Sequence, residues 1–229
     1  MKSQKAMLIK GSVLMASFTA VFILIFMPLF SGGKNGLEYL DNLYNSISKG
    51  SAYYIPELKE ASAPLAGSQV SMTLEMTGTD AAAQALPLLR ASGVTAEQDG
   101  TKLRIGGDLG KLLDNCLEDA DLMYNNKGEQ VRDKYGMDER RALYTWWTLT
   151  KLMDKELKNQ KLFKAAKVVT TVSKKGVETS YNFYKIEPRK ISEKLGVVVF
   201  SLAFYVVYTV WYGFAIMFLF EGLGLRLEH

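Results

Sequence analysis

Histidine and cysteine are almost absent from this sequence. The 229 residues contain one histidine, at position 229, and one cysteine, at position 116. We interpret Leu227-Glu228-His229 as the beginning of a vector-encoded polyhistidine tag, which leaves the rest of the chain without histidine. Histidine-ligated haem or metal sites and Ser-His or Cys-His nucleophilic pairs are therefore excluded, because each needs an imidazole. A lone cysteine also excludes an intramolecular disulfide and a multi-cysteine metal site.

Charge is missing from two long stretches, residues 11–31 and 195–220. Each exceeds the roughly 20 apolar residues needed to cross a hydrocarbon core ~30 Å thick. We therefore predict two transmembrane helices, 11–31 and 195–220, around a single extramembrane domain of residues 32–194. Short tails cover residues 1–10, which are basic, and 221–229, which hold the tag remnant. The first apolar run is too long for a cleaved signal peptide, so we interpret it as a signal anchor.

The orientation follows from basic residues beside the two runs. Lys2, Lys5 and Lys10 precede the first helix and favour a cytoplasmic N-terminus. The basic residues before the second helix favour the opposite orientation. Because the first helix usually sets the orientation, we predict a prokaryotic cytoplasmic (inner) membrane protein with both termini cytoplasmic and the central domain extracytoplasmic, that is, periplasmic.

Small and hydroxyl side chains recur at helical spacing within both apolar runs. Small residues on one face let helices approach closely, and hydroxyls inside a bilayer seek protein partners. We predict helix packing through eight residues: Ser12, Ala16, Ala20, Ser201, Tyr205, Tyr208, Thr209 and Tyr212. The alternative is that the hydroxyl face of the second helix lines a pore or a site for a quinone or a lipid.

The central domain mixes helical and strand patterns, which predicts an α+β domain with a small, mostly antiparallel sheet. Helices are expected over 37–50, over 81–92 with a kink or split at Pro87, from the Asp108 cap to about 124, and over 137–166. Strands are expected over 70–76, in a hairpin of 94–97 with 102–105, and in a closing hairpin of 168–173 with 177–184. The segments 53–56 and 61–68 are expected to be extended or loop.

Candidate chemical sites in the domain are weak. The run Gly106-Gly107-Asp108-Leu109-Gly110 lacks the spacing of a phosphate loop, so we predict a tight turn with a helix cap. Four acids on one helix, Asp114, Glu118, Asp119 and Asp121, lack the spacing of a calcium loop, and we expect a solvated face. Cys116 falls in an apolar helical stripe and is predicted to be buried. We predict no catalytic residue, no metal and no cofactor.

The charge of the domain divides along the chain. Residues 35–126 have a net charge of −7, whereas residues 127–194 have a net charge of +8. The two halves are expected to attract each other, within one chain or between subunits. Four basic residues next to the second apolar run are predicted to contact lipid head groups: Lys185, Arg189, Lys190 and Lys194. Nucleic-acid binding is not expected, because a membrane anchor adjoins the basic half.

These patterns indicate packing and do not reveal a reaction. We predict a non-enzymatic accessory or scaffolding subunit of a prokaryotic membrane protein assembly, whose partners are membrane lipids and other membrane subunits or further copies of itself. The alternatives are a homo-oligomeric channel lined by the hydroxyl face of the second helix and a ligand-sensing envelope domain. An enzyme acting on lipid or cell-wall material is a weaker alternative.

Overall fold

The computed structural model describes residues 2–225, and the side chains of residues 4–225, so the predicted tag remnant lies outside the described residues. The chain forms two compact units. One contains both ends of the chain, residues 1–50 and 188–229, and the other is the domain Ser51–Glu187. We describe each unit by itself.

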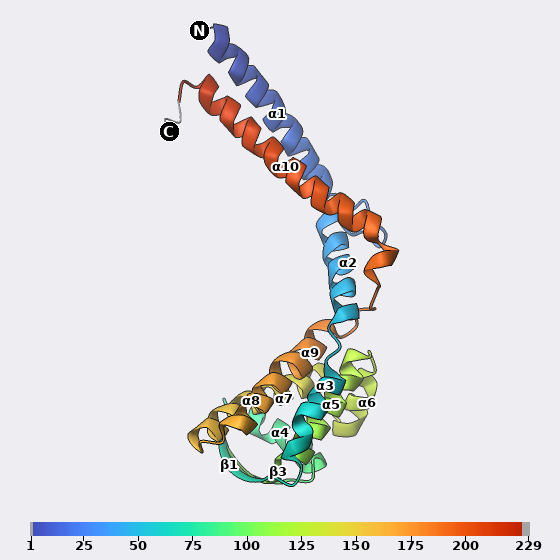
Figure 1. The fold of residues 1–229 in the computed structure, drawn as a ribbon, viewed down its shortest axis with the longest axis vertical. Helices are drawn as coiled ribbons and strands as arrows, with labels where there is room; N and C mark the ends of the chain where they lie inside the picture. Colours follow the sequence, from blue (N-terminus) through green and yellow to red (C-terminus); the bar gives the residue numbers. More distant parts are fainter. Residues whose placement is uncertain (1, 226–229) are drawn as a thin grey trace. The chain divides into compact units, whose positions relative to one another are not determined.

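Two long apolar helices form most of the terminal unit (Figure 1). They are α1, Lys2–Phe26, and α10, Leu195–Gly222, which follows the short 3-10 turn η3, Ile191–Glu193. The two helices lie side by side and antiparallel, so that the beginning of α1 lies near the end of α10. Both are long and apolar enough to cross a membrane. The first helix ends at Phe26 and not at Ser31, because Pro28 cannot continue a helical backbone.

A tight turn connects α1 to the amphipathic helix α2, Gly36–Ser51. Gly32 and Gly33 take positive φ values of 77° and 70°, which favour glycine. The side chain of Asn35 accepts a hydrogen bond from the Glu38 N–H, and the Glu38 side chain accepts one from the Asn35 N–H, both at 2.9 Å. This reciprocal capping box satisfies two N–H groups at the start of the helix. The predicted helix over 37–50 is confirmed.

The domain contains a three-stranded sheet and seven α-helices among the described residues. In chain order the elements are α3 Ile55–Ser62, η1 Ala63–Leu65, β1 Gln69–Glu75, α4 Thr79–Ala91, β2 Thr95–Asp99, β3 Lys102–Asp108, α5 Leu109–Tyr124, α6 Gly128–Tyr135, α7 Glu139–Asn159, α8 Phe163–Thr171, η2 Val172–Glu178 and α9 Thr179–Phe183. The predicted α+β class is confirmed.

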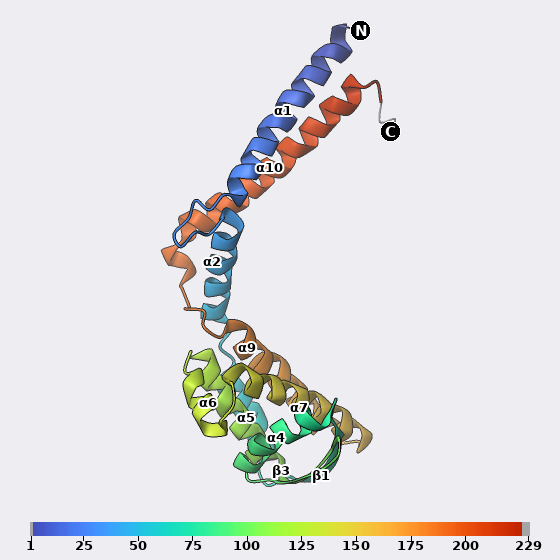
Figure 2. The ribbon, with the colours of Figure 1, turned by 180° about the vertical axis from the view of Figure 1, so that it is seen from behind.

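The sheet is antiparallel, in the order β1-β3-β2, and helices cover one of its faces (Figure 2). Along β1 the side chains alternate, so that Val70, Met72 and Leu74 are buried and the residues between them are exposed. This period of two is the pattern of an antiparallel sheet with one solvated face. The strand over 70–76 and the hairpin over 94–105 were both predicted from the sequence and are confirmed.

Helix α5 runs through the centre of the domain core. Its N-terminus is capped by Asp108, whose side chain accepts hydrogen bonds from the backbone N–H groups of Gly110 at 2.9 Å and Lys111 at 3.4 Å. Gly110 fits because an added Cβ would lie 2.6 Å from the Ala66 backbone. The predicted helix cap is therefore confirmed, whereas the predicted tight turn is wrong, because Gly106, Gly107 and Asp108 belong to β3, which leads directly into α5. Eight side chains of α5 are buried hydrophobic residues: Leu109, Leu112, Leu113, Cys116, Leu117, Ala120, Met123 and Tyr124.

The predicted closing hairpin over 168–184 is wrong. The segment is helical throughout: α8 continues into η2, which is a π-helix, and then into α9. Its β-branched residues suggested strands, but Val169, Val172 and Val177 are buried at helical spacing. Gly176, interpreted as part of a turn, is helical and lies close to the side chains of Leu58 and Leu117. Core packing along one helical face overrides the strand propensity.

Two smaller predictions were also wrong, one helix was missed, and the predicted helix over 81–92 is confirmed without a split at Pro87. Residues 55–62 form α3, because Pro56 occupies the first turn of a helix, where proline is tolerated. The helix α6, over 128–135, was not predicted. Helix α4 continues through Pro87 without a split, and four of its apolar residues are buried. The long helix expected over 137–166 stops at Asn159, because Lys161 takes a left-handed φ of 61° before α8 begins.

Candidate functional site

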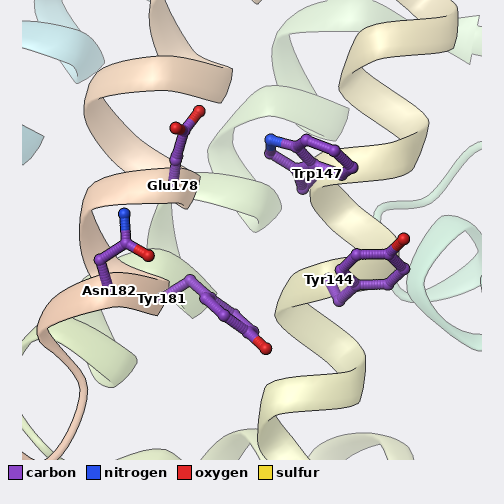
Figure 3. A pocket seen from close by; sticks show the side chains of 5 residues that line it. All are labelled: Tyr144, Trp147, Glu178, Tyr181 and Asn182. Atoms are coloured by element: carbon purple, nitrogen blue, oxygen red, sulfur yellow. The ribbon is translucent and has the colours of Figure 1, made fainter.

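A groove between helix α7 and the η2–α9 segment is the candidate site of the domain (Figure 3). Helix α7 begins at Asp138, whose side chain accepts a hydrogen bond from the Arg141 N–H at 2.9 Å. One face of α7 is buried in the core, which leaves Tyr144 and Trp147 at the outer side. Because they are three residues apart, they share a helical face, and their rings stack with centroids 5.5 Å apart.

The opposite wall comes from the end of η2 and from α9. Glu178, Tyr181 and Asn182 face Tyr144 and Trp147 across the groove, as Figure 3 shows. The hollow between the two walls has a volume of about 210 Å³. The π-helical turn of η2 precedes this wall directly, and π-helical turns occur frequently at functional sites. The groove thus presents three aromatic rings, one amide and one carboxylate.

Two cations of the same domain lie against these aromatic rings. The Lys151 ammonium is 3.6 Å from the centroid of the Trp147 ring, and the Arg140 guanidinium is 5.7 Å from that of Tyr181. Aromatic faces are electron-rich and attract cations. The aromatic surface of the groove is therefore fixed in place by neighbouring side chains, which suits recognition of a ligand or a partner.

A polar hollow of about 310 Å³ adjoins the groove and shares Glu178 with it. The Thr150 hydroxyl lies 2.9 Å from that of Ser173, and the Thr170 hydroxyl donates to Asp154 at 2.8 Å. Asp154 also pairs with Lys158 at 2.7 Å. Because these groups bond to one another, they link helix α7 to α8 and to the start of η2.

Sequence reasoning missed this groove. Adjacent residues of a helix point about 100° apart, so that Trp146 is fully buried whereas Trp147 is only partly buried against the core. Tyr181 was assigned to a strand. The pair Trp146-Trp147 was the available signal, because one of two adjacent tryptophans must leave a helix's buried face.

A buried polar network lies elsewhere in the core, centred on Asp119 and joining α5, α6 and α7. We call it the Asp119 network; its members are Asn115, Asp119, Lys134, Tyr135 and Trp146. Trp146 Nε1 donates to Asp119 at 2.7 Å, the Tyr135 hydroxyl donates at 2.5 Å, and Lys134 Nζ pairs with the other carboxylate oxygen at 2.8 Å. Burial and the neighbouring carboxylate raise the pKa of Tyr135 far above its usual range. Because each carboxylate oxygen has a partner, the network is structural.

The predicted acidic face of α5 is therefore divided. Asp119 is fully buried, Asp114 and Glu118 are exposed, and Asp121 accepts a hydrogen bond from the Tyr53 hydroxyl at 2.7 Å. The structure does not bring these four acids together. Among the residues that the structure describes, no group of three or more His, Cys, Asp or Glu is arranged to hold a metal ion.

Cys116 is fully buried, as predicted. It lies in the core stripe of α5, one helical turn from Asp119. Burial, with a smaller effect of the Asp119 charge, raises the pKa of its thiol well above the ordinary value. A buried thiol that resists ionisation reacts slowly, because the thiolate is the nucleophile.

The eight predicted helix-packing residues take different positions in the terminal unit. Ser201 and Tyr208 lie in helix contacts: the Ser201 hydroxyl is 2.6 Å from that of Tyr44, and the Tyr208 hydroxyl donates to the Phe18 carbonyl at 3.3 Å. Tyr212 is partly exposed, with its ring 5.1 Å from that of Phe18. Five of the eight are exposed and lie outside the α1–α10 contact: Ser12, Ala16, Ala20, Tyr205 and Thr209.

Two glycines allow α1 and α10 to approach each other closely. A Cβ added to Gly11 would lie 2.7 Å from the Leu219 backbone, and one added to Gly222 would lie 2.5 Å from the Leu8 backbone. Trp211 Nε1 also donates to the Leu14 carbonyl at 3.2 Å. The contact within the chain therefore uses a different face of α1 from Ser12, Ala16 and Ala20.

The four basic residues predicted to contact lipid are not equivalent. Lys185 belongs to the domain, where its ammonium is 3.5 Å from Glu139 and 5.0 Å from the centroid of the Tyr184 ring. Burial and the hydrogen bond to Glu139 raise the pKa of Tyr184 to about 12. Arg189, Lys190 and Lys194 belong to the terminal unit and precede α10, where Arg189 and Lys190 are exposed.

The comparisons with known proteins add no relative. The chain matches no protein-family model, no curated protein and no solved structure.

Proposed function

We propose that the chain is a non-enzymatic accessory or scaffolding subunit of a prokaryotic inner-membrane assembly. In this proposal α1 and α10 span the bilayer, and the domain Ser51–Glu187 lies outside the cytoplasm and contacts partners. The observation that carries the proposal is the helix pair: its internal contact leaves the small-residue face of α1 uncovered.

The burial of the two helices supports a membrane location. A helix of 23 residues, such as Gln4–Phe26, is about 35 Å long at 1.5 Å per residue, which exceeds a ~30 Å hydrocarbon core. Only 6% of the most apolar window of each helix is buried. A core helix of a soluble protein would be mostly buried, so lipid is the environment that fits these surfaces.

The uncovered faces support assembly with further helices. Ser12, Ala16 and Ala20 lie on one face of α1 and are exposed, whereas the contact with α10 uses Gly11 and Phe18. Small residues lead to close packing in membranes, where dispersion and hydrogen bonds hold helices together. A second helix pair, from another subunit or another copy, would cover this face.

The aromatic groove supports a partner contact by the domain. Tyrosine and tryptophan are enriched at binding surfaces because they combine a large apolar ring with a polar end. The groove places Tyr144, Trp147 and Tyr181 around one hollow. We propose that it receives a segment of a partner subunit.

The channel alternative has less support from the helix pair. Ser201 and Tyr208 are engaged inside the unit, and the Thr209 hydroxyl donates to the Tyr205 carbonyl of its own helix at 2.8 Å. A pore lined by the whole hydroxyl face would need the first two to leave their partners. Conductance of the reconstituted protein in planar bilayers would test this alternative.

Assembly is tested by the double substitution Ala16→Leu and Ala20→Leu. It should block close approach at the small-residue face and release the co-purifying partners or reduce the oligomer mass, measured by light scattering and mass spectrometry in mild detergent. Ala203→Leu, which makes one such change at an exposed position of α10, is the control. A monomer without partners in the unmodified protein would refute the proposal.

The orientation is tested by protease added to spheroplasts. An extracytoplasmic domain should be digested without lysis, starting in exposed turns. Protection of the domain until lysis would reverse the assigned orientation and would agree with the basic residues that precede α10.

A further inference from the structure

An open apolar hollow lies at the turn between α7 and α8, away from the groove described above. Its volume is about 620 Å³, within the range of ligand-binding clefts. Its walls come from the beginning of β1 and the turn at the start of α8. The apolar lining residues are Leu65, Val70, Leu109, Leu162, Phe163 and Ala165.

Two large apolar side chains at this hollow are exposed to solvent. Phe163 is 63% exposed and Leu162 is 44% exposed, although they are consecutive and belong to a well-packed domain. Exposed apolar groups that line a hollow indicate a surface that is covered by a ligand or a partner. Contact with apolar chains is the interaction that these side chains can supply.

Cations surround this apolar surface. Residues 157–173 contain four lysines and no acid. Lys161 and Lys164 line the hollow itself, and neither belongs to an ion pair among the described residues. Two carboxylates lie near this region: Asp108, opposite Gln69 in the strand register, accepts backbone hydrogen bonds with both oxygens, and Glu156 accepts a hydrogen bond from Gln160, the residue before Lys161. The rim therefore favours an anion.

The backbone also holds a lysine where glycine would be easier. Lys161 takes a φ of 61°, a left-handed conformation that is unfavourable for a residue with a side chain. The turn closes with a hydrogen bond from the Leu162 N–H to the Leu157 carbonyl at 2.8 Å, a geometry in which glycine is the usual residue. The lysine at this position places an ammonium group at the hollow despite the unfavourable φ.

We propose that this hollow binds an anionic amphiphile: an apolar chain lies against Leu162 and Phe163, and the acidic head group contacts Lys161 and Lys164. The chain could be that of a single fatty-acid-like molecule or that of an acidic lipid in a bilayer surface. Both sources offer the same chemistry. The proposal concerns the domain alone and does not depend on the assembly proposed above.

The test is site-resolved photo-crosslinking of the full chain held in phosphatidylcholine nanodiscs. The probe is dodecanoate with a diazirine on its alkyl chain, and the adducts are located by mass spectrometry. Adducts in the domain should concentrate in residues 65–70 and 161–165. The same diazirine chain on a trimethylammonium head group should label these residues about tenfold less, because the lysines repel it.

Two variants separate the two halves of the site. Phe163→Ser and the double substitution Lys161→Glu with Lys164→Glu should each lower labelling about tenfold. The double substitution Lys102→Glu with Lys127→Glu makes the same change in net charge at exposed positions elsewhere and should leave labelling unchanged. Slow reaction of Cys116 with maleimide shows that each variant is folded.

A second arm identifies the source of the chain. Phosphatidylglycerol carrying the diazirine chain is presented in separate vesicles. Labelling of residues 161–165 from these vesicles assigns a bilayer surface, and labelling by free dodecanoate alone assigns a single amphiphile. Labelling from neither source, labelling spread evenly over the domain, or equal labelling by the cationic probe would overturn the proposal.

Discussion

The Asp119 network should contribute a large part of the stability of the domain. The substitution Asp119→Asn keeps the shape of the side chain but replaces one acceptor oxygen with a donor. If the amide oxygen keeps the bonds from Trp146 and Tyr135, the new NH₂ group faces the Lys134 ammonium. Two donors then meet in the core, and a cation loses its counter-ion.

The expected loss is about 3 kcal/mol in the free energy of unfolding. We place it at the lower end for a broken buried pair because the Lys134 side chain is 30% exposed, so that water can solvate part of the unpaired charge. Domains are typically stable by about 5–15 kcal/mol, so the variant should fold but unfold readily. Asp114→Asn, an exposed change on the same helix, should stay within about 0.5 kcal/mol.

The buried thiol of Cys116 provides the assay. In the full chain, urea unfolding in detergent would mix signals from the apolar helices and the domain, but maleimide reaches Cys116 only when the domain opens. At low urea a loss of 3 kcal/mol should make labelling about a hundredfold faster. The double substitution Asp119→Asn with Lys134→Met removes the donor clash and should recover at least about 1 kcal/mol relative to additive effects. An Asp119→Asn variant that labels as slowly as the unmodified protein would refute a structural role for the network.

Three further predictions follow from the turns and the glycines. Although burial alone would raise the pKa of Asp108, hydrogen bonds from the Gly67, Lys111 and Gly110 N–H groups lower it below the ordinary value of 3.8. The stability that the Asp108 carboxylate contributes is therefore complete above pH 3.8 and is lost as the pH falls further. Thermal melts followed by tryptophan fluorescence should show a smaller loss of stability in acid for Asp108→Asn, and an equal loss would contradict this prediction. Lys161→Gly should raise the domain's stability by about 1 kcal/mol, because glycine adopts the left-handed φ without strain. Lys164→Gly, in the first turn of α8, should lower the stability, as measured by Cys116 labelling in urea. A loss of stability in both variants would count against strain at Lys161. Gly222→Ala should push α10 away from Leu8 and slow disulfide formation between cysteines placed at Phe18 and Tyr212. Gly213→Ala, whose added Cβ would meet no atom within 4 Å, should leave the rate of disulfide formation unchanged. Equal rates in the two variants would show that the helices separate at no cost.

The parts of the fold that were predictable are those where local pattern and tertiary packing agree. Three local patterns were sufficient to predict their elements: the alternation of β1, the Asp-Gly turn between β2 and β3, and the capped apolar stripe of α5. The prediction for segment 168–184 failed because its valines are compatible with either period, and packing in the folded core, which includes Leu58 and Leu117, selects the helix. Those contacts come from residues more than fifty positions away, which no local window contains.

The candidate groove was harder to predict than the core. Its two walls are separated by about thirty residues in the chain, and one wall had been assigned as a strand. The exposure of Phe163 and the positive φ of Lys161 are likewise properties of the folded chain. The lysine-rich composition of the second half was visible in the sequence, but its arrangement around an apolar hollow was not.

The number of residues in the π-helical segment η2, rather than the identity of any one side chain, sets which residues of α9 face the groove. An α-helix turns about 100° per residue, so deleting one residue near Lys174 would rotate all that follows by that angle. Glu178 and Tyr181 would leave the groove, and the buried Ser180 would move toward solvent. Substitutions of the exposed Lys174 and Lys175 would disturb neither wall. During evolution the exposed positions of this stretch should therefore accept changes of residue identity, while insertions and deletions of a single residue are removed by selection.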